Sequence, residues 1–195
     1  MENSSSGVEM NFYLIWNKFI LYYKKVSIGK NVTINGKIYC HGNKGKIYIG
    51  DNCIINSSEK SNNTAGGNHT HLVACGNGSI TIGNNVGMSQ VNIVSYNKIV
   101  IEDNVLLGAC VKIWDTDFHS LDYKQRLREE SAENAENRPI YIGEGSFIGA
   151  CSIILKGVRI GKHCVIGAGS VVTKNIPDDE VWAGNPIKFI RKLEK

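Results

Sequence analysis

From Ile142 onward, large aliphatic residues recur at every sixth position of the chain. The six segments read IGEGSF, IGACSI, ILKGVR, IGKHCV, IGAGSV and VTKNIP. Each begins with Ile or Val, usually has Gly second, and has a small or β-branched residue fifth. The same frame occurs upstream, starting at Ile101, Ile82, Ile49 and Ile28. Because a period of six fits neither an amphipathic helix nor a strand of alternating polarity, it indicates an internal repeat.

Each hexad predicts a short strand and a turn that together form one face of a triangular prism. The aliphatic residue points inward, the small residue fits the corner, and Gly relieves the turn. Three hexads make one coil, so residues 142–159, 160–177 and 101–118 each form a coil. Coils stack at the strand spacing of about 4.8 Å. We therefore expect an all-β fold, a parallel β-helix in which neighbouring coils bury each other's faces.

Two stretches break the hexad frame. Residues 56–79 are polar and rich in Gly, Asn and Ser, which predicts a loop or an irregular coil. Residues 119–141 form a longer excursion after Phe118. Long loops carry function more often than the elements they connect, so the second break is the expected place for chemistry.

The two ends of the chain differ from the prism. Residues 1–25 comprise a polar tail over residues 1–7 and an apolar stretch, Met10–Lys25, which predicts a short helix. This stretch is shorter than the about 20 apolar residues that span a bilayer. It either packs on one end of the prism or lies at a membrane surface. Residues 26–180 form the expected β-helix domain. After it, residues 181–195 predict a short basic tail helix that starts at Pro186.

Composition narrows the class of protein. The chain has 195 residues, enough for one domain. Its net charge of +4 suits an anionic small ligand but lacks the dense Lys/Arg stripes of nucleic-acid binders. The 21 Gly accompany only 3 Pro, which excludes collagen and flexible linkers. The six Cys form no CxxC pair, so we expect reduced thiols in the cytoplasm.

The hexads, the segment DTDFHSLD (Asp115–Asp122) and the ending GAGSVVTKNIP…AGNPIKFIRK resemble the hexapeptide-repeat acyltransferases. The His-bearing segment is similar to the subgroup that O-acetylates sugars and polysaccharides. The resemblance covers about residues 26–193. It implies a left-handed prism, a homotrimer with active sites between subunits, and acetyl-CoA as the acyl donor. The handedness does not follow from the residues, because crossovers between parallel strands are nearly always right-handed.

The resemblance and the frame break together identify His119 as the general base. Acyl transfer to a hydroxyl needs a proton acceptor, and histidine suits the task because its ordinary pKa is near 6.5. Asp117 is the carboxylate that we expect to orient the ring, with Asp115 and Asp122 as alternatives. Sugar acetyltransferases use an Asn side chain for the oxyanion where this chain has Ser89, so Ser89 or a backbone N–H is expected to take that role.

The resemblance also implies the coenzyme contacts. Small residues let the pantetheine arm lie along the backbone, cations pair with its phosphates, and an aromatic ring meets the thiol end. These positions are Phe147, Ala150, Ala168, Thr173, Lys174 and Arg191. Trp182 either packs on the adenine or anchors the tail.

These observations predict an acetyl-CoA-dependent O-acetyltransferase acting on a hydroxyl of a sugar or polysaccharide precursor. The alternatives are an N-acyltransferase on an amino sugar or nucleotide-sugar, and a non-catalytic β-helix module for binding or assembly. A zinc-dependent carbonic anhydrase on the same prism needs three converging histidines, and His69 and His71 have no suitable third, so no metal site is predicted. The expected partners are a saccharide acceptor and further copies of the chain, without nucleic acid. The N-terminal helix would allow peripheral association at the cytoplasmic face of a membrane.

Overall fold

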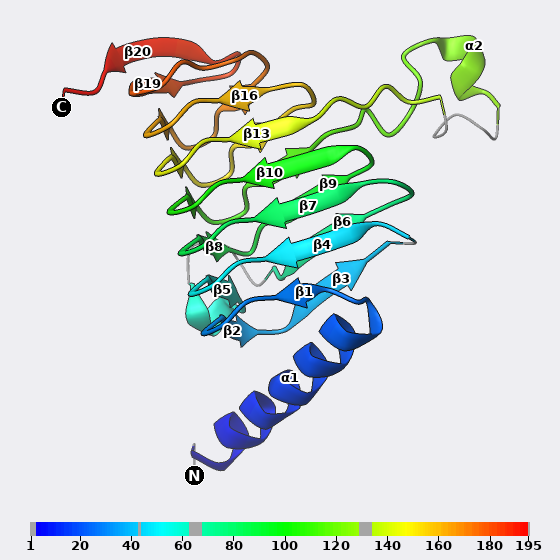
Figure 1. The fold of residues 1–195 in the computed structure, drawn as a ribbon, viewed down its shortest axis with the longest axis vertical. Helices are drawn as coiled ribbons and strands as arrows, with labels where there is room; N and C mark the ends of the chain where they lie inside the picture. Colours follow the sequence, from blue (N-terminus) through cyan, green and yellow to red (C-terminus); the bar gives the residue numbers. More distant parts are fainter. Residues whose placement is uncertain (1–2, 43, 63–67, 129–133, 195) are drawn as a thin grey trace.

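The structure is a computed structural model that describes residues 3–42, 44–62, 68–128 and 134–194, with side chains from Phe12 onward. Strands of successive coils stack along one axis, and helix α1 (Asn3–Tyr23) lies across the N-terminal end (Figure 1). Strands of consecutive coils pair in parallel and form three sheets, called here faces A, B and C. The expected parallel β-helix is therefore confirmed.

Within the described residues, faces A and C have six strands each and face B has eight. Face A consists of β1 (Ser27–Ile28), β4 (Lys46–Ile49), β7 (Ser79–Ile82), β10 (Lys98–Ile101), β13 (Ile140–Ile142) and β16 (Arg159–Ile160). Face B consists of β2 (Thr33–Gly36), β5 (Ile54–Ser57), β8 (Gly87–Ser89), β11 (Leu106–Leu107), β14 (Phe147–Ile148), β17 (Val165–Ile166), β19 (Glu180–Ala183) and β20 (Lys188–Lys192). Face C consists of β3 (Ile38–His41), β6 (Thr70–Ala74), β9 (Asn92–Ser95), β12 (Lys112–Trp114), β15 (Ile153–Ile154) and β18 (Val171–Val172).

The packing of the last coils follows the hexad frame. The strand register pairs Ile142 with Ile160 and Ile148 with Ile166, so residues one coil apart stack directly. The first residues of the six hexads are at most 1% exposed and form the core of the prism. The fifth residues are buried as well: Ser146, Ser152, Val158, Cys164, Ser170 and Ile176. Burying one such aliphatic side chain stabilises the fold by about 1.5–3 kcal/mol, so these stacked columns hold the prism together.

The chain turns at three corners, named A/B, B/C and C/A after the faces that they join. Residues with left-handed φ occur at all three corners, with Gly42, Lys44, Gly76, Phe118 and Gly157 at the C/A corner. At the A/B corner they are Asn31, Asn52, Asn85, Asn104, Gly145, His163 and Asp179, with φ between 54° and 68°. At the B/C corner they include Gln90, Cys110, Cys151 and Gly169, with φ between 50° and 69°. Asn, Asp and Gly adopt this conformation most readily.

Helix α1 closes the N-terminal end of the prism. The Asn17 amide donates to the carbonyl of Gly36 at 2.9 Å and accepts from the N–H of Ile38 at 3.0 Å, while Ile20 is buried. The packing interpretation of this segment is therefore confirmed. The helix begins at Asn3, so the expected polar tail over residues 1–7 is wrong from Asn3 onward, because extending an existing helix costs far less than nucleating one.

The expected loop over residues 56–79 is only partly a loop. The segment holds the end of β5, a 3₁₀ turn (η1, Glu59–Ser61), all of β6 and the start of β7. The hexad pattern does not predict strand β6, because Thr70 and His71 interrupt the hexad. Leu72 and Ala74 nevertheless enter the core, and β6 pairs with β3 and β9.

The expected C-terminal helix is wrong. Residues 188–192 form β20, which pairs antiparallel with β19 at the C-terminal edge of face B. The ring centroids of Trp182 and Phe189 lie 5.8 Å apart, and the Trp182 Nε1–H donates to a Glu180 carboxylate oxygen at 2.7 Å. Tertiary pairing with an open sheet edge outweighs the local propensity of the segment. Trp182 thus anchors the tail.

The break after Phe118 is confirmed. Between β12 and β13 the chain leaves the prism and carries the short helix α2 (Tyr123–Arg126). In Figure 1 this yellow-green segment extends well beyond the stacked coils.

Candidate functional site

A strip of bare backbone runs along the B/C corner. Ala150 and Ala168 occupy the same place in successive coils, and the backbone between them is close-packed. A Cβ on Gly108 would lie 2.6 Å from the backbone N of Ala150, and a Cβ on Gly149 would lie 2.5 Å from that of Ala168. Phe147 begins β14 beside this strip and is 41% exposed. Ala168 and Gly169 are exposed and their side chains are small, so a long flexible ligand can approach main-chain groups at this corner.

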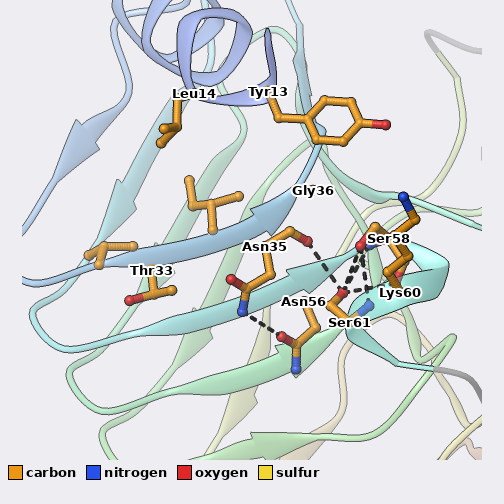
Figure 2. A pocket seen from close by; sticks show the side chains of 11 residues that line it. Tyr13, Leu14, Thr33, Asn35, Gly36, Asn56, Ser58, Lys60 and Ser61 are labelled. Carbon is orange, nitrogen blue, oxygen red and sulfur yellow. Dashed lines mark hydrogen bonds between the residues drawn. The ribbon is translucent and has the colours of Figure 1, made fainter. Parts of the chain in front are cut away.

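Ser89 lies at the same corner, at the end of β8. Its side chain is buried, and its Oγ accepts a hydrogen bond from Asn56 Nδ2 at 3.4 Å. Asn35 Nδ2 in turn donates to Asn56 Oδ1 at 3.0 Å, a bond drawn in Figure 2. Because the Ser89 oxygen already accepts, its hydroxyl hydrogen is available to donate.

His119 lies at the opposite end of face C from Ser89. It follows β12 at the C/A corner, where the excursion begins, and is exposed. The base of the excursion is closed by Lys156, whose Nζ lies 3.3 Å from Asp117 Oδ2 and 2.9 Å from Glu136 Oε2. Asp117 thus helps to close the stem that presents His119.

The two alternative carboxylates are engaged elsewhere. Asp115 is fully buried and accepts from the Ser95 hydroxyl at 2.7 Å and from the backbone N–H groups of Tyr96 and Asn97 at 2.7 and 2.9 Å. Asp122 caps α2 by accepting from the Lys124 N–H at 2.8 Å. Both carboxylates stabilise turns.

The remaining expected coenzyme contacts lie apart from the B/C corner. Thr173 and Lys174 follow β18 at the C/A corner and are exposed. Arg191 lies on the exposed strand β20. One chain therefore brings Phe147, Ala150, Ala168 and Ser89 to one corner, while His119, Thr173 and Lys174 lie at another.

A pocket of about 710 Å³ lies between α1 and the first coils of face B. Figure 2 shows Tyr13 and Leu14 of α1 above Thr33, Asn35 and Gly36. Its lining is mainly apolar, with a polar side at Asn35 and Asn56. The pocket thus contains the Asn pair that leads to Ser89.

A second cavity, of about 360 Å³, opens where the B/C corner meets face C. It is lined by Asn68, His69, His71, Gln90, Asn92, Cys110, Lys112 and Trp114. The His71 ring stacks on Tyr39 with centroids 4.8 Å apart, and His41 stacks at 6.2 Å. Burial, followed by the charges of His41 and His69, lowers the pKa of His71 below its ordinary value of 6.5. The lowered pKa favours the neutral imidazole.

His69 and His71 are candidates from the sequence, whereas the other residues of this cavity, among them Gln90, Lys112 and Trp114, are not. One signal was present, because Gln90 is a long side chain at a corner where the following coils have Cys or Gly. Lys112 and Trp114 carry no signal of their own, since outward positions of a strand accept most residue types.

Residues 139–174 match the family described as bacterial transferase hexapeptide (six repeats). These residues are a transferase hexapeptide repeat. The hexapeptide segment spans the coils from β13 to β18, including Ala150 and Ala168 of the B/C corner.

The chain is also similar to named acetyltransferases beyond this segment. A galactoside O-acetyltransferase of Lactococcus lactis is 38% identical over 145 residues, which are 74% of this chain and 62% of the relative. A solved galactoside acetyltransferase in complex with coenzyme A is 27% identical with a TM-score of 0.51, over 86% of this chain and 65% of that one. The chain thus spans somewhat less than two thirds of the length of these relatives.

A solved hexapeptide-repeat acetyltransferase from Vibrio cholerae shows the fold over a wider span. It matches with a TM-score of 0.56 and 24% identity, over 96% of this chain and 82% of the other. The fold is accordingly the left-handed β-helix of the hexapeptide-repeat acetyltransferases, as the sequence resemblance implies.

No described helix is both long and apolar enough to cross a membrane. Among the same residues, no three or more His, Cys, Asp and Glu side chains gather to hold a metal ion.

Proposed function

We propose that this chain is an acetyl-CoA-dependent O-acetyltransferase that modifies a hydroxyl of a sugar or polysaccharide precursor. The observation that carries the proposal is the bare strip at the B/C corner, which ends beside the Ser89 hydroxyl. Similarity to galactoside O-acetyltransferases supports the reaction class. Pantetheine would lie along Ala150 and Ala168, with its thiol end near Phe147.

The reaction would proceed by direct attack. His119 accepts the proton of the sugar hydroxyl as its oxygen bonds to the thioester carbonyl carbon. The carbonyl electrons move onto oxygen, and the Ser89 O–H donates to the resulting oxyanion. The C–S bond then breaks, the carbonyl re-forms, and the coenzyme sulfur takes the proton from His119. Acetyl-CoA and alcohol thus give ester and coenzyme A without a covalent enzyme intermediate.

The division of the site between two corners supports a homotrimer. If face C lies against neighbouring copies, the C/A corner of one copy meets the B/C corner of the next. His119, Thr173 and Lys174 of one copy would then complete the strip of another. The outward positions of face C include half-buried Val94 and Ile153, which suit a subunit interface better than the charged outward positions of face A at Lys46 and Lys98.

His119→Ala tests the assignment of the base. We expect free coenzyme A release with saccharide acceptors to fall about 10²- to 10⁴-fold, while acetyl-CoA binding by calorimetry stays within twofold. His163→Ala is the matched control, because His163 is also exposed but belongs to the A/B corner. Turnover that survives His119→Ala would remove His119 from the mechanism. Absence of coenzyme A release by the wild type with every acceptor, amino sugars included, would favour a binding module.

A mixing experiment tests the shared site. His119→Ala and Ala168→Leu should each be inactive or impaired, and co-refolded mixtures should regain part of the activity if two copies build one site. Failure to exceed the sum of the separate variants, with mixed trimers shown by native mass spectrometry, would place the whole site in one chain.

We also propose peripheral membrane association through α1, in a cytoplasmic protein. The side of α1 away from the prism exposes large apolar residues near Lys18 and Lys24. These residues are Phe12, Ile15, Phe19, Tyr22 and Tyr23. Flotation with anionic vesicles, abolished by Phe19→Glu with Ile15→Glu, would support the proposal, and no flotation of the wild type would refute it.

A further inference from the structure

The cavity at the junction of the B/C corner and face C is built from three successive coils. Asn68, His69 and His71 belong to one coil, Gln90 and Asn92 to the next, and Cys110, Lys112 and Trp114 to the third. At about 360 Å³ it is large enough for a small-molecule ligand. Its residue Gln90 directly follows Ser89, so the cavity adjoins the proposed transfer point.

Gln90 is an unusual occupant of its corner. Its backbone N–H donates to Asn56, just as those of Cys110, Cys151 and Gly169 donate to the coil before them. Those three positions hold small side chains, whereas Gln90 carries a full amide. Gln90 is only 3% exposed, and among the described residues neither its Nε2 nor its Oε1 has a hydrogen-bond partner.

A buried amide without partners weakens a fold unless a ligand supplies them. An apolar residue at this corner would avoid that cost. The Gln90 amide therefore indicates a polar ligand that both donates and accepts hydrogen bonds, as a sugar does.

The lining of the cavity also supplies an aromatic surface, Trp114, and a positive charge, Lys112. The Trp114 Nε1–H donates to Asn92 Oδ1 at 2.9 Å, and the Phe118 ring packs edge-on at 5.6 Å, so the indole is held in place. The Lys112 Nζ lies 5.8 Å from the centroid of the Trp114 ring. None of the eight lining residues is acidic. The indole offers a face to the C–H groups of a pyranose, and the ammonium offers a partner to an anion.

We infer that this cavity binds the acceptor and that the acceptor is an anionic sugar. Lys112 pairs with its carboxylate or phosphate, Trp114 packs on its ring, and the Gln90 amide bonds to its hydroxyls. Gln90 and Lys112 are thereby specificity-determining residues. The inference rests on the proposed function for the reaction, and it adds the acceptor class and the residues that select it.

Direct binding tests the inference independently of turnover. The full-length protein is titrated by calorimetry with three probes: a uronic acid disaccharide, a hexose phosphate and the matching neutral disaccharide. We expect an anionic probe to bind at least about tenfold more tightly than the neutral one. The anionic probe that binds more tightly identifies the source of the charge. Equal affinity for all three, or no binding, would overturn the inference even if the enzyme acetylates other acceptors.

Lys112→Met provides the matched test of the charge. It should lower affinity and kcat/KM for the preferred anionic sugar about 10- to 100-fold, with neutral sugars changed less than about twofold. Lys98→Met is the control, because the Lys98 Nζ also lies 5.8 Å from an aromatic centroid, that of Tyr141, but on face A. Equal losses in both variants, or no loss in Lys112→Met, would contradict the assignment.

Gln90→Met separates recognition from folding. Removing an unpartnered amide should leave the midpoint of urea unfolding unchanged or raised, while affinity for the anionic sugar falls about tenfold. A lowered midpoint with unchanged affinity would show that Gln90 serves the fold.

Discussion

The A/B and B/C corners both turn the chain through residues with left-handed φ, but the side chains of those residues differ. At the A/B corner, left-handed residues are mostly Asn, and their side chains pair along the axis. Asn31 donates to Asn52 at 3.2 Å, and Asn85 donates to Asn104 at 3.1 Å. At the B/C corner the left-handed residues after Gln90 are the small Cys110, Cys151 and Gly169, and the side-chain amide of Gln90 has no partner among the described residues.

The two corners therefore differ in their side chains: mainly paired amides at A/B, and mainly small residues at B/C. Where the side chains bond to one another along the axis, as at A/B, the corner contributes to stability. Where they are small, backbone groups stay accessible, and a cavity and a strip open beside Ser89. The corners therefore predict opposite effects of mutation: loss of stability at A/B, and loss of ligand binding at B/C.

Asn85→Val should give the largest effect of this comparison. A β-branched residue at φ 56° costs roughly 1–2 kcal/mol, and the bond to Asn104 contributes about 1 kcal/mol. We expect the free energy of unfolding, measured in urea at fixed protein concentration, to fall by roughly 2–3 kcal/mol. Activity per folded molecule should be unchanged.

Asn85→Gly is the control, because glycine retains the φ and loses only the side-chain bond. Equal destabilisation by Val and Gly would assign the effect to the hydrogen bond. A loss of activity without a loss of stability would mean that the A/B corner is part of the site.

The hexad period predicts the prism because each repeat repeats the same local packing. It places Ile142, Ile148 and Ile154 in the core and marks the break before His119. It does not predict β20, since pairing with β19 depends on an edge that exists only after the prism has formed. The sequence does not predict the cavity at Gln90 for the same reason. Whether the Gln90 amide has a hydrogen-bond partner depends on side chains from three successive coils, and the hexad spacing does not say where those side chains lie.

Ala168→Leu should give the second largest effect. Ala168 is exposed, so the larger side chain should leave folding intact while it covers the backbone strip. We expect the KM for acetyl-CoA to rise about tenfold, equivalent to about 1.4 kcal/mol, with kcat changed less. Thr81→Leu, an outward position of face A, is the control. An unchanged KM would place the coenzyme away from the B/C corner.

The pH dependence of stability should give the smallest effect. It concerns His71, which lies on strand β6 of face C and lines the cavity beside Gln90. Burial and the neighbouring His41 and His69 lower the pKa of His71 in the folded protein. Between the lowered pKa of His71 in the folded protein and its ordinary pKa of 6.5, the unfolded chain binds a proton more readily than the folded one. The free energy of unfolding therefore decreases as the pH is lowered through this range. Above pH 6.5 the contribution is fully present. His71→Asn should flatten the slope of the unfolding free energy between pH 6.5 and the lowered pKa, measured by urea titration at several pH values. An equal slope in the variant would assign the acid sensitivity to other groups and leave the cavity beside Gln90 unaffected by protonation of His71.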